Sequence, residues 1–332
     1  MPAPTLERAA RRIATLLGGA GGSIRDPGDG GAALDFEADV VVRPLDRLGP
    51  PADVWAVDGG QALVADARCL QVLATRAARV RFVSGRCVVE DEGELRHHLL
   101  GGAEERAAAV AALGLEGLAA DTSVDVNLLR DRWEWDAVAR SVEEAGPGAL
   151  VLVDGDLQPD WRIPSSFLAG LLARAAERGA TLAGVIKHSS LSRGGAPLVG
   201  QLELEAARSL GPRATWWAPV ARTRAAERPD AGEGIQVLAA RLDPDARFAF
   251  RVDLPAAADP AVILGRLSAL CDDAAFPGYP YPLTVADRLA ACPGWVRSES
   301  WLQLEELLRR EGVAAAVTER AFADRHRLME RS

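Results

Sequence analysis

A short run of purely apolar residues, Ala149–Val153, ends in Asp154 followed by Gly155. An uninterrupted apolar run of this length is typical of a strand buried on both faces in a parallel or mixed sheet. A second apolar stretch, Val54–Val57, also ends in an Asp-Gly pair, at Asp58. Two such strands can bring carboxylates together for metal binding. Asp-Gly is also the commonest turn chemistry, so the pattern favours a metal site only in combination with other evidence.

The bulk properties indicate a globular protein. The chain has 332 residues, of which 48% are hydrophobic and 26% charged, enough for one large domain or two modest ones. No apolar run approaches the roughly 18 residues of a membrane span. The N-terminus lacks the basic and then apolar order of a signal peptide. We therefore expect a cytoplasmic protein that has no membrane partner.

The net charge of −9 disfavours strong, non-specific binding to DNA, for which basic domains are expected. It does not exclude a nuclease, because local arginines can contact phosphate and a partner can supply the main grip on DNA.

The cysteines and histidines show no zinc-binding spacing, since neither a CxxC pair nor an HxxxH pair occurs. Any metal must therefore be held mainly by carboxylates, which favours Mg²⁺ or Mn²⁺ over Zn²⁺.

The order of the expected elements predicts the fold class. The β-rich block Val54–Val89 predicts three antiparallel strands, with a turn at Asp58-Gly59 and a returning run at Gln61–Cys69. Glu90–Leu118 and Thr122–Glu144 are expected to be helical.

The strand Ala149–Val153, a helix at Ser165–Arg178 and a strand at Thr181–Ile186 complete the order three strands, helix, strand, helix, strand. This order is that of the ribonuclease H-like fold. We predict an α/β protein with a ribonuclease H-like mixed sheet flanked by helices, with N-terminal and C-terminal extensions.

The two ends of the chain are expected to be less regular. A helix at Thr5–Leu17 precedes the glycine-rich segment Gly18–Gly31, which we interpret as a flexible loop because no Lys-Ser or Lys-Thr pair of a phosphate loop follows it. Residues 1–50 therefore form an N-terminal extension, residues 51–295 the core domain, and residues 296–332 a helical extension.

The last third of the chain predicts one hairpin and three helices. The hairpin joins Gly234–Leu242 to Ala246–Leu254 through a turn at Asp243-Pro244-Asp245. The helices are expected at Pro260–Cys271, Thr284–Ala291 and Ser298–Glu311. The last is amphipathic, and packing on its own domain explains this better than docking to a partner.

In the predicted strand order, Asp58 and Asp154 become neighbours, and Glu134 on the intervening helix is the best candidate for a third acid. Three clustered carboxylates stay ionised only when cations neutralise them. Two divalent ions roughly 3.5–4 Å apart would do so and would clamp a phosphodiester for attack by water. A solvated helix face is the alternative for Glu134. Lys187, directly after the strand at 181–186, would face the same site and hold a phosphate.

Four motifs in their order along the chain resemble the NurA family of nucleases. They are Val57–Gly60, Leu152–Gly155, Gly184–Lys187, and Gly278–Leu283 with Ala286-Asp287. The resemblance covers roughly residues 50–295. It implies a ribonuclease H-like core and Mn²⁺-dependent cleavage of DNA ends in double-strand break repair. The expected activity is a 5′–3′ exonuclease and single-strand endonuclease, as a homodimer docked on a hexameric HerA-type ATPase.

By this resemblance, Asp58, Glu134 and Asp154 are the metal-binding and catalytic acids, with Lys187 as a further catalytic residue. The cofactor is expected to be Mn²⁺, with Mg²⁺ as the alternative, as two ions. The family commonly has a histidine where this chain has Asp287, which we take as a fourth ligand. The residues expected to contact DNA are Lys187, His188, Tyr279 and Tyr281.

Two other functions remain open. One is an ATP-using phosphotransferase of the actin and sugar-kinase type, in which Asp58–Gln61 would be a phosphate loop. The other is a catalytically degenerate adaptor of the translocating ATPase, which the acidic charge and the departure at Asp287 favour.

Overall fold

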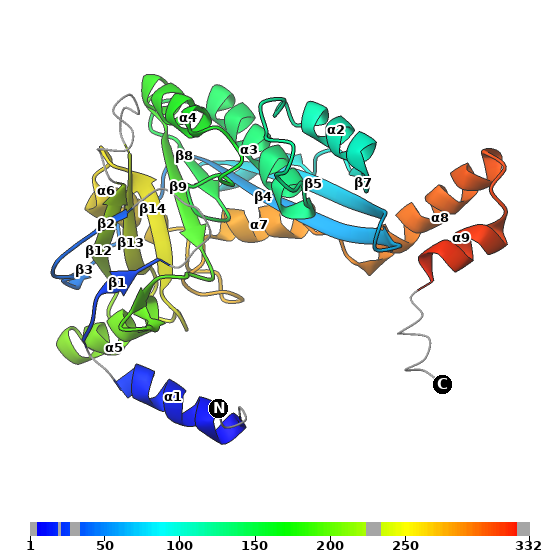
Figure 1. Cartoon of the computed structure of the whole chain (residues 1–332). Helices are drawn as coiled ribbons and strands as arrows, with labels where there is room; N and C mark the ends of the chain where they lie inside the picture. Colours follow the sequence, from blue (N-terminus) through cyan, green and yellow to red (C-terminus); the bar gives the residue numbers. More distant parts are fainter. Residues whose placement is uncertain (1–4, 19–20, 27–33, 224–233, 324–332) are drawn as a thin grey trace. The chain divides into compact units, whose positions relative to one another are not determined.

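The computed structural model describes residues 5–18, 21–26, 34–223 and 234–323 (Figure 1). The chain forms two compact units. One consists of Met1–Ala56, Val80–Val89 and Val138–Val285, and the other of Val57–Arg79, Glu90–Ala137 and Ala286–Ser332. The chain passes between the units several times, so neither is one continuous stretch of sequence.

Most strands of the described residues belong to one mixed sheet. In the order in which they pair, they are β2 (Leu34–Phe36), β12 (Trp216–Thr223), β13 (Ile235–Arg241), β14 (Phe250–Pro255), β9 (Thr181–Ile186), β8 (Leu150–Val153), β4 (Asp53–Asp66), β5 (Gln71–Val83) and β6 (Arg86–Asp91). Two further strands pair with this path, β3 (Arg43–Pro44) with β12 and β7 (Arg96–Leu100) with β5. A small sheet contains β1 (Ile24–Arg25), β10 (Ser192–Arg193) and β11 (Ala196–Pro197).

Helices separate many of these strands along the chain. In the described residues they are α1 (Leu6–Gly18), α2 (Ala103–Ala112), α3 (Val126–Glu144), α4 (Ser165–Glu177), α5 (Leu198–Ser209), α6 (Pro260–Ser268), α7 (Tyr281–Ala290), α8 (Gly294–Arg310) and α9 (Ala315–Phe322). Among these helices, none combines the length and the apolar character that crossing a membrane requires. The predicted mixed α/β fold is confirmed.

The predicted strand, helix, strand segment forms the centre of the sheet. All four residues of β8 are buried, and β8 pairs in parallel with β9. Helix α4 connects the two strands and buries Leu168, Leu171, Leu172 and Ala175, at the spacing of one helical face (Figure 1). The apolar run at 149–153 therefore behaves as expected for a strand covered on both sides.

The predicted C-terminal hairpin is also present, but its second strand begins at Phe250 and not at Ala246. Strands β13 and β14 pair antiparallel, with Leu238 opposite Val252. The Asp243 carboxylate accepts a hydrogen bond from the Asp245 N–H at 2.8 Å. This side-chain bond closes the turn that the Asp-Pro-Asp sequence predicted.

The predicted turn at Asp58-Gly59 is wrong. The backbone runs extended through both glycines, and β4 continues without interruption from Asp53 to Asp66. The chain turns only at residues 67–70, where the Ala67 N–H donates to the Leu70 carbonyl at 2.9 Å. The glycines allow close packing of neighbouring groups against the strand and do not form a turn.

The prediction of helix across Glu90–Leu118 is wrong in its first part. Strand β6 ends at Asp91, and β7 follows before α2 begins at Ala103. Along β7 burial alternates, because Arg96, His98 and Leu100 are half-buried while His97 and Leu99 are exposed. Strand β7 pairs with β5, with His98 opposite Leu73, and this pairing satisfies its backbone hydrogen bonds. The acidic composition indicated a helix, but tertiary pairing overrides that weak local preference.

The structure describes only part of the segment Gly18–Gly31, which was predicted to be a flexible loop. Residues 19–20 and 27–31 lie outside the described part of the chain. Within the rest, Ile24–Arg25 forms β1 and pairs antiparallel with Ser192–Arg193 of β10. Ile24–Arg25 is therefore a strand, whereas residues 21–23 and 26 are irregular.

The partly buried side chain of His98 should make the folded protein less stable in acid. Its Nε2 lies 2.7 Å from the Thr75 hydroxyl, and burial, followed by the charges of Arg96 and His97, lowers its pKa to about 4. An unfolded chain binds the proton near pH 6.5, so the free energy of unfolding should fall as the pH drops from about 6.5 towards 4. The measurement is urea unfolding across that pH range.

The variant His98→Gln keeps a polar partner for Thr75 but does not titrate. Its stability should therefore depend less on pH than that of the wild type, whereas the exposed His188→Gln should follow the wild type. Equal slopes for His98→Gln and the wild type would show that His98 does not carry the effect.

Candidate metal centre

Asp58 lies inside β4, where its side chain is half-buried. Its Oδ1 accepts a hydrogen bond from the N–H of Gly59 at 2.7 Å. A carboxylate that accepts a backbone N–H is held in a defined orientation.

The two glycines after Asp58 admit neighbouring groups on opposite sides of the strand. A Cβ on Gly59 would lie 2.6 Å from Glu134 Oε2 and 3.1 Å from Arg130 Cγ of α3. A Cβ on Gly60 would lie 1.9 Å from the carbonyl oxygen of Ala290, at the end of α7. Successive residues of a strand face opposite sides, so α3 and α7 each approach through one glycine. The motif is part of an extended strand, which removes the turn that a phosphate loop at Asp58–Gln61 requires.

Glu134 is buried on α3, with only 6% of its surface exposed. A Cβ on Gly59, the residue that follows Asp58, would lie 2.6 Å from its Oε2. The helix therefore directs this carboxylate to β4 at Gly59 and not to solvent, as the alternative interpretation required. Glu134 is not one of the three described carboxylates that lie together.

Asp154 follows the last residue of β8, and its side chain is 8% exposed. The ammonium of Lys187, which follows β9, donates to Asp154 Oδ2 at 2.6 Å. The parallel pairing of β8 and β9 explains this neighbourhood, since both residues leave the sheet at the carboxyl ends of adjacent strands. His188 is the next residue and is exposed.

The Tyr-Pro-Tyr-Pro segment places its two tyrosines in different surroundings. Tyr279 is buried, packs against Phe250 with ring centroids 5.5 Å apart, and has the Lys187 ammonium 5.0 Å from its ring centroid. Tyr281 begins α7, is 46% exposed, and meets Phe82 edge-on. Only Tyr281 therefore offers a ring face to a large ligand.

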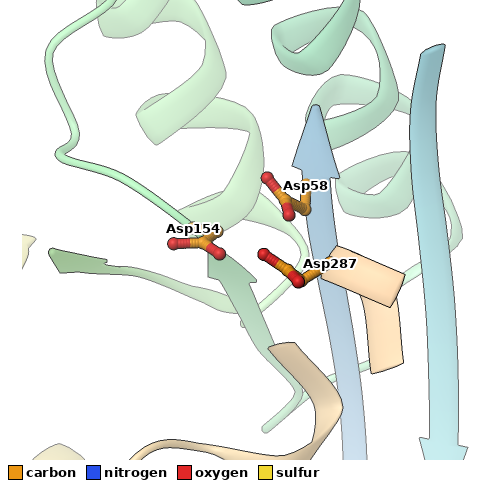
Figure 2. A group of neighbouring side chains, drawn as sticks. All are labelled: Asp58, Asp154 and Asp287. Carbon is orange, nitrogen blue, oxygen red and sulfur yellow. The ribbon is translucent and has the colours of Figure 1, made fainter. Parts of the chain in front are cut away.

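Three carboxylates meet in one group. One oxygen each from Asp58, Asp154 and Asp287 lies within 4.8 Å of the others (Figure 2). Asp58 comes from β4, Asp154 from the end of β8 and Asp287 from α7. Asp287 is more exposed than the other two aspartates. Three oxygen donors of this kind suit hard divalent cations such as Mg²⁺, Mn²⁺ or Ca²⁺.

Sequence reasoning missed a buried ion pair, Arg251 and Asp253, on β14. Asp253 is fully buried, and burial raises the pKa of its carboxyl, while the neighbouring guanidinium of Arg251 opposes that shift. The signal was present as two charged residues alternating with Phe250, Val252 and Leu254 in a strand. Such alternation is also typical of a strand with one solvent face, so it did not predict burial.

Comparisons with known proteins identify a solved structure with a similar fold. No family model and no curated protein matches the chain. Among solved structures, the NurA nuclease from Sulfolobus solfataricus matches with a TM-score of 0.54 and 14% identity, over 93% of this chain and 96% of that one. The catalytic domain of human endonuclease V matches over 86% of this chain and 96% of its own, with 17% identity and a TM-score of 0.39. The fold of the chain is therefore that of the NurA nuclease.

Proposed function

We propose that this chain, with the fold of the NurA nuclease, is a metal-dependent DNA nuclease that hydrolyses phosphodiester bonds. The observation that carries the proposal is the group of three carboxylates, Asp58, Asp154 and Asp287, within 4.8 Å of one another. The resemblance of the motifs around these residues to the NurA family supports the same activity.

The donor set fits Mn²⁺ or Mg²⁺. All three side chains offer carboxylate oxygens. Glu134 lies outside this group, beside Gly59 of β4, and we propose it as a fourth acid. We propose that these acids hold two ions, with Mn²⁺ as the working cofactor. When bound, such ions polarise the phosphate and supply hydroxide at neutral pH.

The remaining residues act on the substrate. Lys187 carries the positive charge beside Asp154, and we assign it to the non-bridging oxygens of the scissile phosphate. Tyr281 exposes its ring, which can stack on a base of an unpaired strand, and His188 lies exposed next to Lys187. Tyr279 is buried, so we assign it to supporting Lys187 from beneath.

The biological setting follows from the resemblance alone. We propose 5′–3′ exonuclease and single-strand endonuclease activity on DNA ends during double-strand break repair. The protein would act as a homodimer with a hexameric HerA-type ATPase in the cytoplasm. A partner of this kind would supply the grip on DNA that an overall charge of −9 does not.

Metal removal tests the proposal. The whole protein is incubated with single-stranded and blunt-ended DNA, labelled at either end, in Mn²⁺, Mg²⁺ or EDTA. We expect cleavage in Mn²⁺, none in EDTA, and recovery when Mn²⁺ is added back, because the carboxylates alone cannot activate water.

The position of the label in the shortest products reports polarity. Two results together would refute the proposal. One is that no substrate is cleaved in either metal, and the other is that Mn²⁺ leaves the midpoint of thermal unfolding unchanged. ATP hydrolysis by the isolated protein under the same conditions would favour a phosphotransferase instead.

A further inference from the structure

The segment after Asp154 crosses a strand that has no side chain at the crossing point. Gly184 of β9 pairs with Val153 of β8 on one side and with Asp253 of β14 on the other. A Cβ on Gly184 would lie 2.5 Å from the carbonyl oxygen of Gly155 and 3.2 Å from the nitrogen of Leu157. Residues 155–157 therefore lie directly on the sheet at Gly184.

Asp253 holds this segment from the neighbouring strand. Residues paired directly across two strands point to the same face, so the Asp253 side chain shares the face of Gly184 over which residues 155–157 run. Its Oδ2 accepts the N–H of Leu157 at 3.3 Å. The contact joins β14 to the loop that begins with Asp154, across the width of β9.

Arg251 makes the buried charge of Asp253 tolerable. It lies two residues earlier on the same face of β14 and donates to both carboxylate oxygens, at 2.8 and 2.9 Å. The same guanidinium lies 3.4 Å from Asp26 and 4.0 Å from Asp156, the second residue after Asp154. Arg251 therefore balances negative charge on β14, within the loop and at Asp26. Removing it alone would leave a buried carboxylate without compensation.

We propose that Arg251 and Asp253 are positioning residues for Asp154. They fasten residues 155–157 to the sheet and so fix the direction in which Asp154 leaves β8 towards Lys187. This assignment rests on the proposed function, in which Asp154 is a metal ligand. Partners that orient a ligand typically change metal affinity or activity about 10–100-fold when they are lost.

The test replaces the pair with apolar residues in the double variant Arg251→Met/Asp253→Leu. Apolar replacement of a whole buried pair preserves folding more often than removal of one partner. Two Mn²⁺ concentrations are measured: the one that gives half-maximal cleavage, and the one that gives half of the rise in unfolding midpoint that Mn²⁺ causes. We expect both to increase about 10–100-fold. Asp253→Asn, which keeps the shape of the side chain, should shift both in the same direction by less.

The matched control is a second bidentate Arg-Asp pair at the other end of β8. Arg81 donates to both oxygens of Asp53 at 2.9 Å, and Asp53 lies beside Gly146, before β8 begins. The double variant Arg81→Met/Asp53→Leu should change the unfolding midpoint but leave the Mn²⁺ requirement as in the wild type. If the Arg251 and Asp253 variants also keep the wild-type Mn²⁺ requirement, the pair is structural only and the proposal is overturned.

Hydrogen exchange separates this proposal from the nuclease assignment. Exchange of the amides of residues 155–157 should accelerate in Arg251→Met/Asp253→Leu and in Asp253→Asn but not in the control, whether or not the protein cleaves DNA. If exchange accelerates in the variants but the wild-type protein shows no metal-dependent cleavage, Arg251 and Asp253 do hold residues 155–157 and the nuclease function is rejected. Unchanged exchange at these amides in both variants would reject the fastening itself.

Discussion

Replacing Asp58 with asparagine is expected to reduce Mn²⁺-supported cleavage of DNA by about 10²-fold or more, the scale on which loss of one electrostatic contact to a transition state is felt. Asparagine keeps the size of the side chain and can still accept the Gly59 N–H, which Asp58 Oδ1 accepts at 2.7 Å. The change therefore removes the charge and not the local geometry. Cleavage rates at saturating Mn²⁺, compared with the wild type, measure it.

Thermal unfolding separates loss of the metal from loss of the fold. In EDTA, Asp58→Asn should unfold at or above the wild-type temperature, because the variant relieves repulsion in a group of three carboxylates. Mn²⁺ should raise the unfolding midpoint of the wild type and much less that of the variant. The exposed Asp121→Asn is the control and should match the wild type in both assays. Wild-type cleavage by Asp58→Asn would end the assignment of this acid.

Gly60→Ala is expected to destabilise the protein by about 1–3 kcal/mol, the typical effect of forcing a methyl group into a packed interior. The new Cβ would lie 1.9 Å from the carbonyl oxygen of Ala290 and 2.8 Å from its carbon. Both are backbone atoms at the end of α7, so neither can move aside as a flexible side chain does. Denaturant unfolding in EDTA measures the loss without interference from metal binding.

Gly170→Ala is the matched control. Gly170 lies inside α4, and a Cβ there would have nothing within 4 Å. The same chemical change should therefore stabilise the protein by about 0.5–1 kcal/mol, because alanine loses less conformational freedom in a helix. If both variants changed stability alike, close packing at Gly60 would not be the reason for a glycine there.

The centre of the fold could be predicted because its signals are local. Strand β8 is a run of apolar residues, α4 has helical spacing, and a turn at Asp243–Asp245 separates β13 from β14. Each pattern reports burial or turn chemistry within about ten residues of chain, on which local reasoning rests. The same reasoning led to Asp58 and Asp154, whose carboxylates the structure brings together with Asp287.

The remainder depends on contacts that local patterns do not carry. Asp58-Gly59 has the composition of a turn, but Glu134 on α3 and Ala290 on α7 occupy the space beside the glycines and the strand stays extended. Asp287 drew attention only through the resemblance of the surrounding motif. Arg251 and Asp253 have the alternation of an ordinary half-exposed strand, and the sequence pattern does not reveal that both are buried or that Asp253 accepts the N–H of Leu157.

The paired glycines of β4 have a consequence for how related sequences would diverge. A side chain at Gly60 would meet the backbone of Ala290, and one at Gly59 would displace the side chain of Glu134, so both positions are constrained by space. Asp58 is constrained by the metal binding that we propose for it. Under the proposed function, a descendant that had lost catalysis would be free to change the acid while it retained both glycines. In such a lineage the glycine pair would mark ancestry, and the aspartate before it would mark whether the proposed metal site is retained.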